Sequence, residues 1–176
     1  RSHVGTNDLS AKINERPQME TSFSYDFSLE KHETTCGDFK KVMEEEYGDK
    51  FFPAKCDNDS LPITNVTYYD AILYANARSK ASHLDTVYSY QGKNFNSNNH
   101  CINLEGLNFL PEENGFRLPL EAEWMLSAAQ GWNTKNSWIA DNSKGQVHKV
   151  CQNGQNTAGF CDFEGNVMEW VNDWLG

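Results

Sequence analysis

Asp162 and Glu169 are two carboxylates that stand seven positions apart in the sequence. The segment Glu164-Gly165-Asn166 lies between them, and Gly and Asn are typical of tight turns. A turn there would fold Asp162 back towards Glu169, and such oxygen ligands suit a hard cation. The alternative interpretation is that Asp162 only caps a turn and that Glu169 is solvated.

Five cysteines are the second group of residues with chemistry of their own: Cys36, Cys56, Cys101, Cys151 and Cys161. None forms a C-x-x-C pair, and no Cys/His set has the spacing of a structural zinc site. Five buried thiols in a cytosolic protein are one interpretation. We favour an exported protein with two disulfides and one remaining thiol. Sequence proximity suggests the pairs Cys36–Cys56 and Cys151–Cys161, although the sequence does not fix the pairing.

Other motifs that would indicate catalysis are missing from the sequence. The five histidines form no H-E-x-x-H motif, and there is neither a G-x-S-x-G motif nor a P-loop. Catalytic residues therefore stay unknown. Trp170 and Trp174 could stack on a sugar or a peptide, but we expect them in the core, where such residues are more often found.

The composition excludes some partners. The 176 residues carry a net charge of -10, and no basic run could neutralise phosphates, so nucleic acid and anionic membranes are not expected. No stretch reaches the roughly 20 apolar residues of a transmembrane helix. No signal peptide is visible either, and the start at Arg1 resembles a cleaved end, so we expect that any export signal has been removed.

Apolar residues at helical spacing predict three helices, at about 35–47, 68–80 and 119–130. Alternating apolar residues predict a half-buried strand at 19–31, with Phe23, Tyr25, Phe27 and Leu29 on one face. Two β-rich runs at 86–90 and 102–109, joined by the polar link 91–100, predict a hairpin with a long tip. Because helices and strands do not alternate regularly, the fold class is α+β.

Four segments of the chain, in order, resemble the formylglycine-generating enzyme (sulfatase-modifying factor) family. Residues 5–35 are similar to its opening, with GTND, ERP and then LEKHETT. Residues 61–71 (LPITNVTYYDA) resemble its Pro-Val-x-x-Val-Ser-Trp-x-Asp-Ala. Residues 115–124 (GFRLPLEAEW) resemble Gly-x-Arg-Leu-Pro-Thr-Glu-Ala-Glu-Trp, and 156–170 (NTAGFCDFEGNVMEW) resemble Asn-x-x-Gly-Leu-x-Asp-Met-x-Gly-Asn-Val-Trp-Glu-Trp.

The resemblance implies a variant of the C-type lectin fold, low in regular secondary structure. It also implies a structural calcium bound by Asp162, Gly165, Val167 and Glu169, two through side chains and two through backbone carbonyls. We expect one domain over 1–176 that is C-terminally incomplete, because in the family's enzymes a later Arg-Gly-Gly-Ser segment and the copper-binding cysteine pair follow.

Three departures from the family pattern bear on function. None of the five cysteines stands where the catalytic pair would, so copper is expected only if a further segment supplies that pair. Met168 replaces the Trp that lies near the substrate cleft in the family. Leu120 replaces the Thr of the capping box, which removes about 1 kcal/mol of stability from the helix start.

Two hypotheses for the function follow. We favour an exported, non-catalytic binding module for a protein, peptide or carbohydrate ligand. The alternative is a copper-dependent oxidase that converts a sulfatase cysteine to formylglycine, with its catalytic cysteines in a further C-terminal part.

Overall fold

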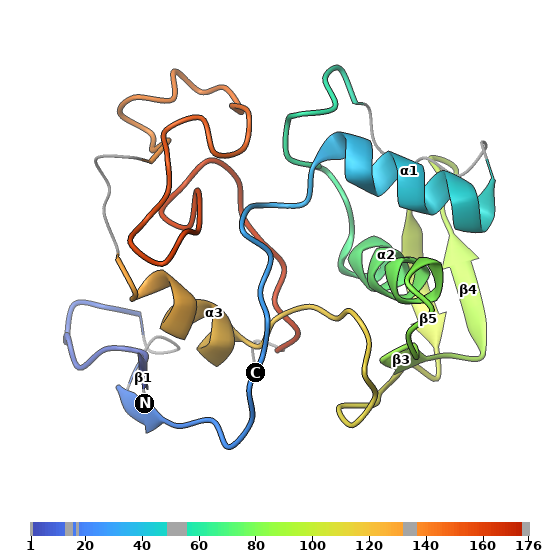
Figure 1. Ribbon diagram of the computed structural model, residues 1–176, viewed down its shortest axis with the longest axis horizontal. Helices are drawn as coiled ribbons and strands as arrows, with labels where there is room; N and C mark the ends of the chain where they lie inside the picture. The colour runs from blue at the N-terminus through green and yellow to red at the C-terminus, as the bar shows by residue number, and fades with distance from the viewer. Residues whose placement is uncertain (1, 13–15, 17, 49–55, 132–136, 174–176) are drawn as a thin grey trace. The chain divides into compact units, whose positions relative to one another are not determined.

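The two helices expected at 35–47 and 68–80 are both present, as α1 (Cys36–Tyr47) and α2 (Tyr68–Ala81) (Figure 1). Thr35 and Thr67 cap their first turns, each accepting a hydrogen bond from a backbone N–H three residues on. Helix α1 ends at Gly48, whose φ of 83° is a conformation that glycine adopts readily.

The computed structural model describes residues 2–12, 16, 18–48, 56–131 and 137–173. The chain divides into two compact units. Unit 1 comprises Arg1–His32, Pro119–Gln146 and Cys151–Gly176, and unit 2 comprises Glu33–Leu118 and Val147–Val150. None of the helices in the described part of the chain combines the length and the apolar character needed to cross a bilayer.

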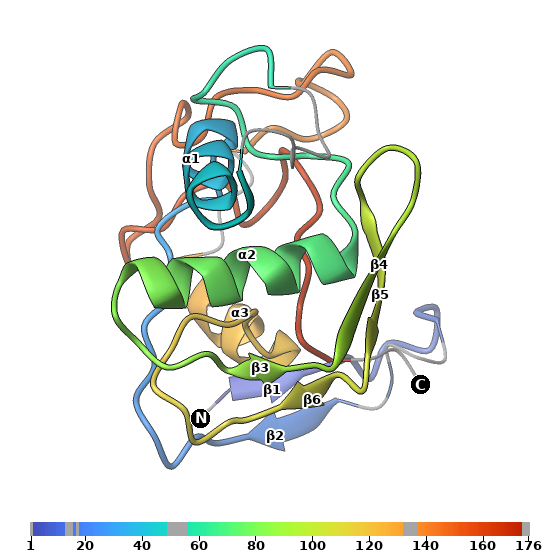
Figure 2. The same ribbon diagram turned by 90° about the vertical axis from the view of Figure 1, so that its right-hand side faces the viewer.

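The apolar core of unit 2 surrounds α2, which packs against both α1 and the strand β5 (Cys101–Glu105) (Figure 2). Phe39 and Met43 from α1 meet Ile72 and Leu73 from α2, and all four side chains are at most 1% exposed. The ring of Phe39 also stacks on Tyr74, with ring centroids 5.0 Å apart. This burial, rather than helix propensity, is the main stabilisation of the two helices.

The expected hairpin is present in unit 2 but has more strand than predicted. Strand β3 (Tyr88–Ser89) pairs with β6 (Asn108–Phe109), and β4 (Gly92–Phe95) pairs with β5 (Cys101–Glu105), both antiparallel. Strand β4 lies inside the polar link that was predicted to be a loop, so that part of the prediction was wrong. Polar residues are tolerated in β4 because its last three residues are exposed.

Unit 1 contains the short ladder of β1 (Ser2–Val4) with β2 (Met19–Thr21), and α3 (Glu121–Ala128) contacts β1. The strand predicted at 19–31 was therefore too long. Residues 22–31 have no ladder partner, and the aromatic rings of this segment pack on one another instead. The Phe23 ring is 5.5 Å from both Tyr25 and Phe27 in edge-on arrangements.

Helix α3 is shorter than the predicted 119–130, and Leu120 serves as its N-cap residue. Leucine has no side-chain acceptor, so the expected loss of one half of the capping box is real. The other half remains, because the Leu120 N–H donates to Glu123 Oε2 at 2.8 Å. Glu123 is 1% exposed, and its Oε1 accepts from the Tyr25 hydroxyl at 2.9 Å, so this buried carboxylate is hydrogen-bonded on both oxygens.

Candidate functional site

The segment that contains the four candidate cation ligands forms an irregular loop in unit 1. Asp162 has a left-handed backbone (φ 64°), and its carbonyl accepts a hydrogen bond from the Gly165 N–H at 3.1 Å. Asn166 is also left-handed (φ 65°). The turn expected at 164–166 therefore begins two residues earlier, at Asp162. Residues 162–166 reverse the chain direction before Glu169.

Gly165 allows this loop to lie directly against the backbone at Trp138. The Asn166 N–H donates to the Trp138 carbonyl at 2.8 Å. A Cβ atom at position 165 would stand only 2.1 Å from that carbonyl oxygen, so a larger residue would have to push the two segments apart. Glycine at this position thus fixes the path of the backbone that includes the Gly165 and Val167 carbonyls.

The two oxygens of the Asp162 carboxylate have different surroundings. Oδ2 accepts a hydrogen bond from the Cys151 N–H at 2.7 Å. Oδ1 is buried and has no hydrogen-bond partner among the described residues. Asp162 is only 4% exposed, and this burial raises the pKa of the carboxyl above its ordinary value, although the Cys151 N–H opposes the shift. A buried carboxylate oxygen without a partner is costly unless something else satisfies it.

Glu169 directs its carboxyl group to the same region. Its Oε2 accepts a hydrogen bond from the Trp124 indole N–H at 3.1 Å. The residue as a whole is exposed, but protein atoms surround the carboxyl group itself, and this burial raises the pKa of Glu169 to about 7. The Trp124 N–H lowers it, and the nearby negative charge of Asp162 raises it further. The two carboxyl groups are therefore close enough for the charge of Asp162 to act on Glu169.

These residues fit a hard divalent cation. The Asp162 carboxylate has one buried oxygen without a described hydrogen bond, and its negative charge raises the pKa of Glu169, while His32 is a nearby group that lowers the pKa of Asp162. Gly165 and Val167 lie between them on the same half-buried loop. The side chains and backbone supply only oxygen ligands, which is what calcium requires and what zinc or copper would not select.

Both expected disulfides are present, Cys36–Cys56 in unit 2 and Cys151–Cys161 in unit 1. Cys101 is the remaining thiol; it is fully buried, and burial raises its pKa. The sulfurs of Cys151 and Cys161 and an oxygen of Asp162 all lie within 4.8 Å of one another. Because the two sulfurs are bonded to each other, they are not thiolate ligands for a metal.

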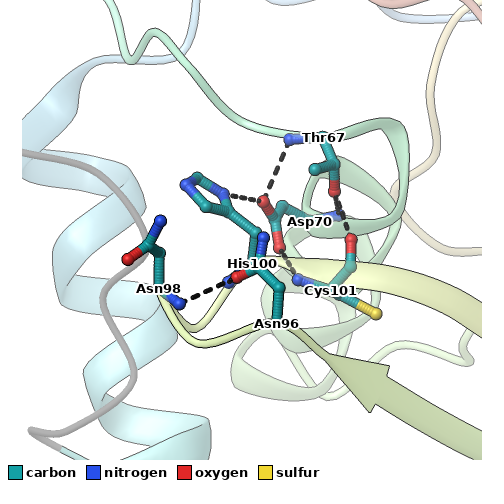
Figure 3. A network of polar contacts seen from close by, with 6 residues as sticks. All are labelled: Thr67, Asp70, Asn96, Asn98, His100 and Cys101. Atoms are coloured by element: carbon teal, nitrogen blue, oxygen red, sulfur yellow. Dashed lines mark hydrogen bonds and ion pairs between the residues drawn. The ribbon is translucent and has the colours of Figure 1, made fainter.

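A second polar cluster lies in unit 2, and the sequence did not predict it (Figure 3). Asp70 is completely buried, and its carboxylate accepts three hydrogen bonds, from Thr67 N–H at 2.9 Å, Cys101 N–H at 2.7 Å and His100 Nδ1 at 2.8 Å. It joins the start of α2 to the start of β5. The capping-box pattern Thr67-x-x-Asp70 was a readable signal, but nothing in the sequence indicates the partner thirty positions away.

A family model for the sulfatase-modifying factor enzyme 1-like domain matches residues 3–176. The chain belongs to this family. The chaperone protein LppX of Paenibacillus barcinonensis is 29% identical over an alignment of 181 residues, and the alignment covers 85% of this chain. The chain spans only about three fifths of that relative, 62% of its length.

Two solved structures have the same mixed arrangement of helices and short sheets. The Treponema denticola variable protein 1 superposes with a TM-score of 0.61 at 26% identity, covering 81% of this chain and 60% of that one. The crystal structure of CarF gives a TM-score of 0.59 at 21% identity, covering 81% and 67%, and this second likeness concerns the fold alone.

Within this sulfatase-modifying-factor domain, two exposed apolar side chains flank the candidate ligand Glu169. Met168 is 98% exposed and Trp170 is 48% exposed. The expectation that Trp170 belongs to the core was therefore wrong. The reason is local: residues 168–170 are all exposed, and the Trp124 indole and Phe163 pack together instead, with centroids 5.0 Å apart. Trp174 lies outside the described residues.

Proposed function

We propose that this chain is an exported, non-catalytic binding module of its family, held in shape by calcium, that contacts a protein or peptide. The observation that supports it most is the pair of exposed apolar side chains, Met168 and Trp170, on either side of the candidate ligand Glu169. Contact residues of this kind, large and apolar, contribute most of the binding energy in protein interfaces.

Calcium is the proposed organiser of this surface. Asp162 and Glu169 would supply side-chain oxygens, and Gly165 and Val167 would supply backbone carbonyls. The bound ion would neutralise the two carboxyl groups and satisfy Asp162 Oδ1, and it would thereby hold the backbone that presents Met168. We further propose that the fold is the family's variant of the C-type lectin fold.

Two further observations support the non-catalytic, exported interpretation. Four of the five cysteines are bridged and the fifth is buried, so none of them offers the accessible thiol pair that copper chemistry needs. Disulfides persist mainly in oxidising compartments, which favours the periplasm, the cell surface or secretion. The similarity to a protein named as a chaperone favours a protein or peptide ligand over a carbohydrate.

The alternative function is a formylglycine-generating oxidase, and the family membership itself favours it. That activity would convert the thiol of a sulfatase cysteine to an aldehyde using copper and oxygen. It would depend on a free cysteine pair supplied by residues outside this sequence.

A selection experiment tests the proposal against both alternatives. A library of displayed random peptides and an array of immobilised glycans are screened with the oxidised protein in calcium. We expect peptides whose binding is lost in Met168→Asp and retained in Leu9→Asp, because Leu9 is another exposed apolar residue of unit 1 (85% exposed) outside the loop.

Glycan binding without peptide binding would replace the proposed ligand class with carbohydrate. Aldehyde formation on a cysteine peptide from a sulfatase, with copper and oxygen present, would establish the oxidase instead. Peptide binding that is equal in the two Asp variants would contradict the proposed surface.

A further inference from the structure

The Cys151–Cys161 disulfide lies directly beside the candidate cation ligand Asp162. Cys161 precedes Asp162 in the chain, and the N–H of Cys151 donates to Asp162 Oδ2 at 2.7 Å. The two sulfurs and a carboxylate oxygen of Asp162 lie within 4.8 Å of one another. The hydrogen bond leaves the other carboxylate oxygen, Oδ1, buried and without a described partner. The bridged residue Cys151 therefore occupies Oδ2 of Asp162, and Oδ1 is the oxygen that a cation in the proposed site would meet.

The backbone at both residues is in a conformation that needs external support. Cys151 and Asp162 are left-handed, with φ of 58° and 64°, a region that residues with a Cβ atom rarely adopt. Such conformations persist where the surrounding structure enforces them. At Cys151 the disulfide supplies that constraint, and a turn in which the Gly154 N–H donates to the Cys151 carbonyl at 3.3 Å assists it.

The other end of the bridge and the loop it closes have supports of their own. The Cys161 N–H donates to the Lys31 carbonyl at 2.8 Å. Asn156 organises the loop tip: its Oδ1 accepts from the N–H groups of Ala158 and Phe160, both at 3.0 Å, and its own N–H donates to the Phe160 carbonyl at 2.7 Å. Cleaving the disulfide should therefore release Cys151 first and leave the loop tip and Cys161 in place.

We propose that the Cys151–Cys161 disulfide is a positioning element of the cation site, so that reduction of this bridge weakens cation binding and a bound cation protects the bridge from reduction. This inference rests on the proposed cation site.

A dithiol reductant supplies two electrons and two protons: the S–S bond breaks, two thiols form, and the reductant becomes a cyclic disulfide. Cys151 can then leave the left-handed region, and its N–H moves away from Asp162.

The size of the effect follows from the role of hydrogen bonds to metal ligands. Removing a group that orients a ligand typically weakens metal affinity by about 10–100-fold. Because linkage is reciprocal, the cation must lower the equilibrium constant for reduction of this bridge by the same factor. A disulfide that only stabilised the fold would not respond selectively to the cation.

Calcium titration of the oxidised protein and two double variants tests the affinity. We expect the Cys151→Ser/Cys161→Ser variant to bind calcium about 10–100-fold more weakly than the wild type. The matched control, Cys36→Ser/Cys56→Ser, removes the bridge of the other unit and should keep the wild-type affinity within about twofold. Circular dichroism checks that each variant is folded.

A second measurement needs no variant and so does not depend on how well the variants fold. The wild type is equilibrated in dithiothreitol redox buffers with saturating calcium or with chelator, and each bridge is quantified by thiol trapping and mass spectrometry. Calcium should protect Cys151–Cys161 by the factor found in the titration and leave Cys36–Cys56 unchanged.

Equal calcium affinity with and without Cys151–Cys161, or equal protection of both bridges, would overturn this inference while leaving the cation site intact. No calcium binding by the oxidised wild type would overturn the cation site itself, and this inference with it.

Discussion

Without calcium, Glu169 should make the stability of the protein fall as the pH rises from 5 to 8. Its pKa is raised from 4.5 to about 7 in the folded chain, so the folded state binds the proton more tightly than the unfolded state does. The stability linked to that proton is fully present below pH 4.5, the unfolded value, and is lost as the pH rises through 7. Above about pH 8 the dependence on Glu169 should level off.

The magnitude follows from the pKa values in the two states. A rise from 4.5 to about 7 corresponds to at most about 3 kcal/mol. Because Glu169 as a residue is exposed, solvent screens part of this interaction, and we expect about 1–2 kcal/mol. The raised pKa of Asp162 acts in the same direction.

Urea unfolding in excess chelator at pH 5, 6, 7 and 8, followed by circular dichroism, measures the effect. The Glu169→Gln variant is the control: it should match the wild type at pH 5 and be more stable at pH 8, since it has no charge to bury. The rest of this acidic chain contributes equally to both curves. Parallel pH profiles for the wild type and Glu169→Gln would refute the electrostatic account of the loop.

Three further predictions concern other parts of the chain. Asp70→Ala should lower the free energy of unfolding by about 2–4 kcal/mol, because three donors lose their acceptor. His100→Ala should lower it by only about 1 kcal/mol. Equal losses for the two variants in urea titrations would contradict this. Gly165→Ala should abolish calcium-dependent stabilisation, because the added Cβ meets a carbonyl oxygen. In the same melting assay Gly145→Ala should retain it, because the Cβ added there meets nothing within 4 Å. Thiol titration should find one thiol, Cys101, only after denaturation, and a thiol that reacts in the native protein would show that this residue is accessible.

Local signals in the sequence located the helices and suggested the disulfide pairs. Thr35 marks the start of α1 and Gly48 marks its end, because a hydroxyl N-cap and a left-handed glycine each act within one helical turn. The bridges connect cysteines that are 20 and 10 positions apart, so proximity in sequence was informative.

Features that depend on distant partners were not predictable in the same way. The alternation of Phe23, Tyr25 and Phe27 indicates one shared face, and the structure uses that face for ring packing instead of a strand ladder. The burial of Asp70 beside His100 depends on how the hairpin meets α2, which no local pattern encodes. Trp170 is large and aromatic, and only the path of the loop decides whether such a side chain is buried or exposed.

The exposure of Met168 was not predictable from the sequence. Its replacement of a family tryptophan put substrate handling in doubt, but no feature of the sequence indicated where the side chain would point. Met168 is 98% exposed, and it follows a turn in which Asp162 is left-handed and Gly165 lies directly against the backbone of Trp138.

A melting curve of the oxidised protein with calcium or with excess chelator tests the cation site most directly. At a calcium concentration about 100-fold above the dissociation constant, binding to the folded state alone adds about 2.7 kcal/mol, which raises the melting temperature of a domain of this size by about 5–10 °C. We expect that rise in the wild type, a smaller one in Asp162→Asn, whose amide oxygen can still coordinate, and none in Glu169→Ala. Identical midpoints with calcium and with chelator in the wild type would contradict the account.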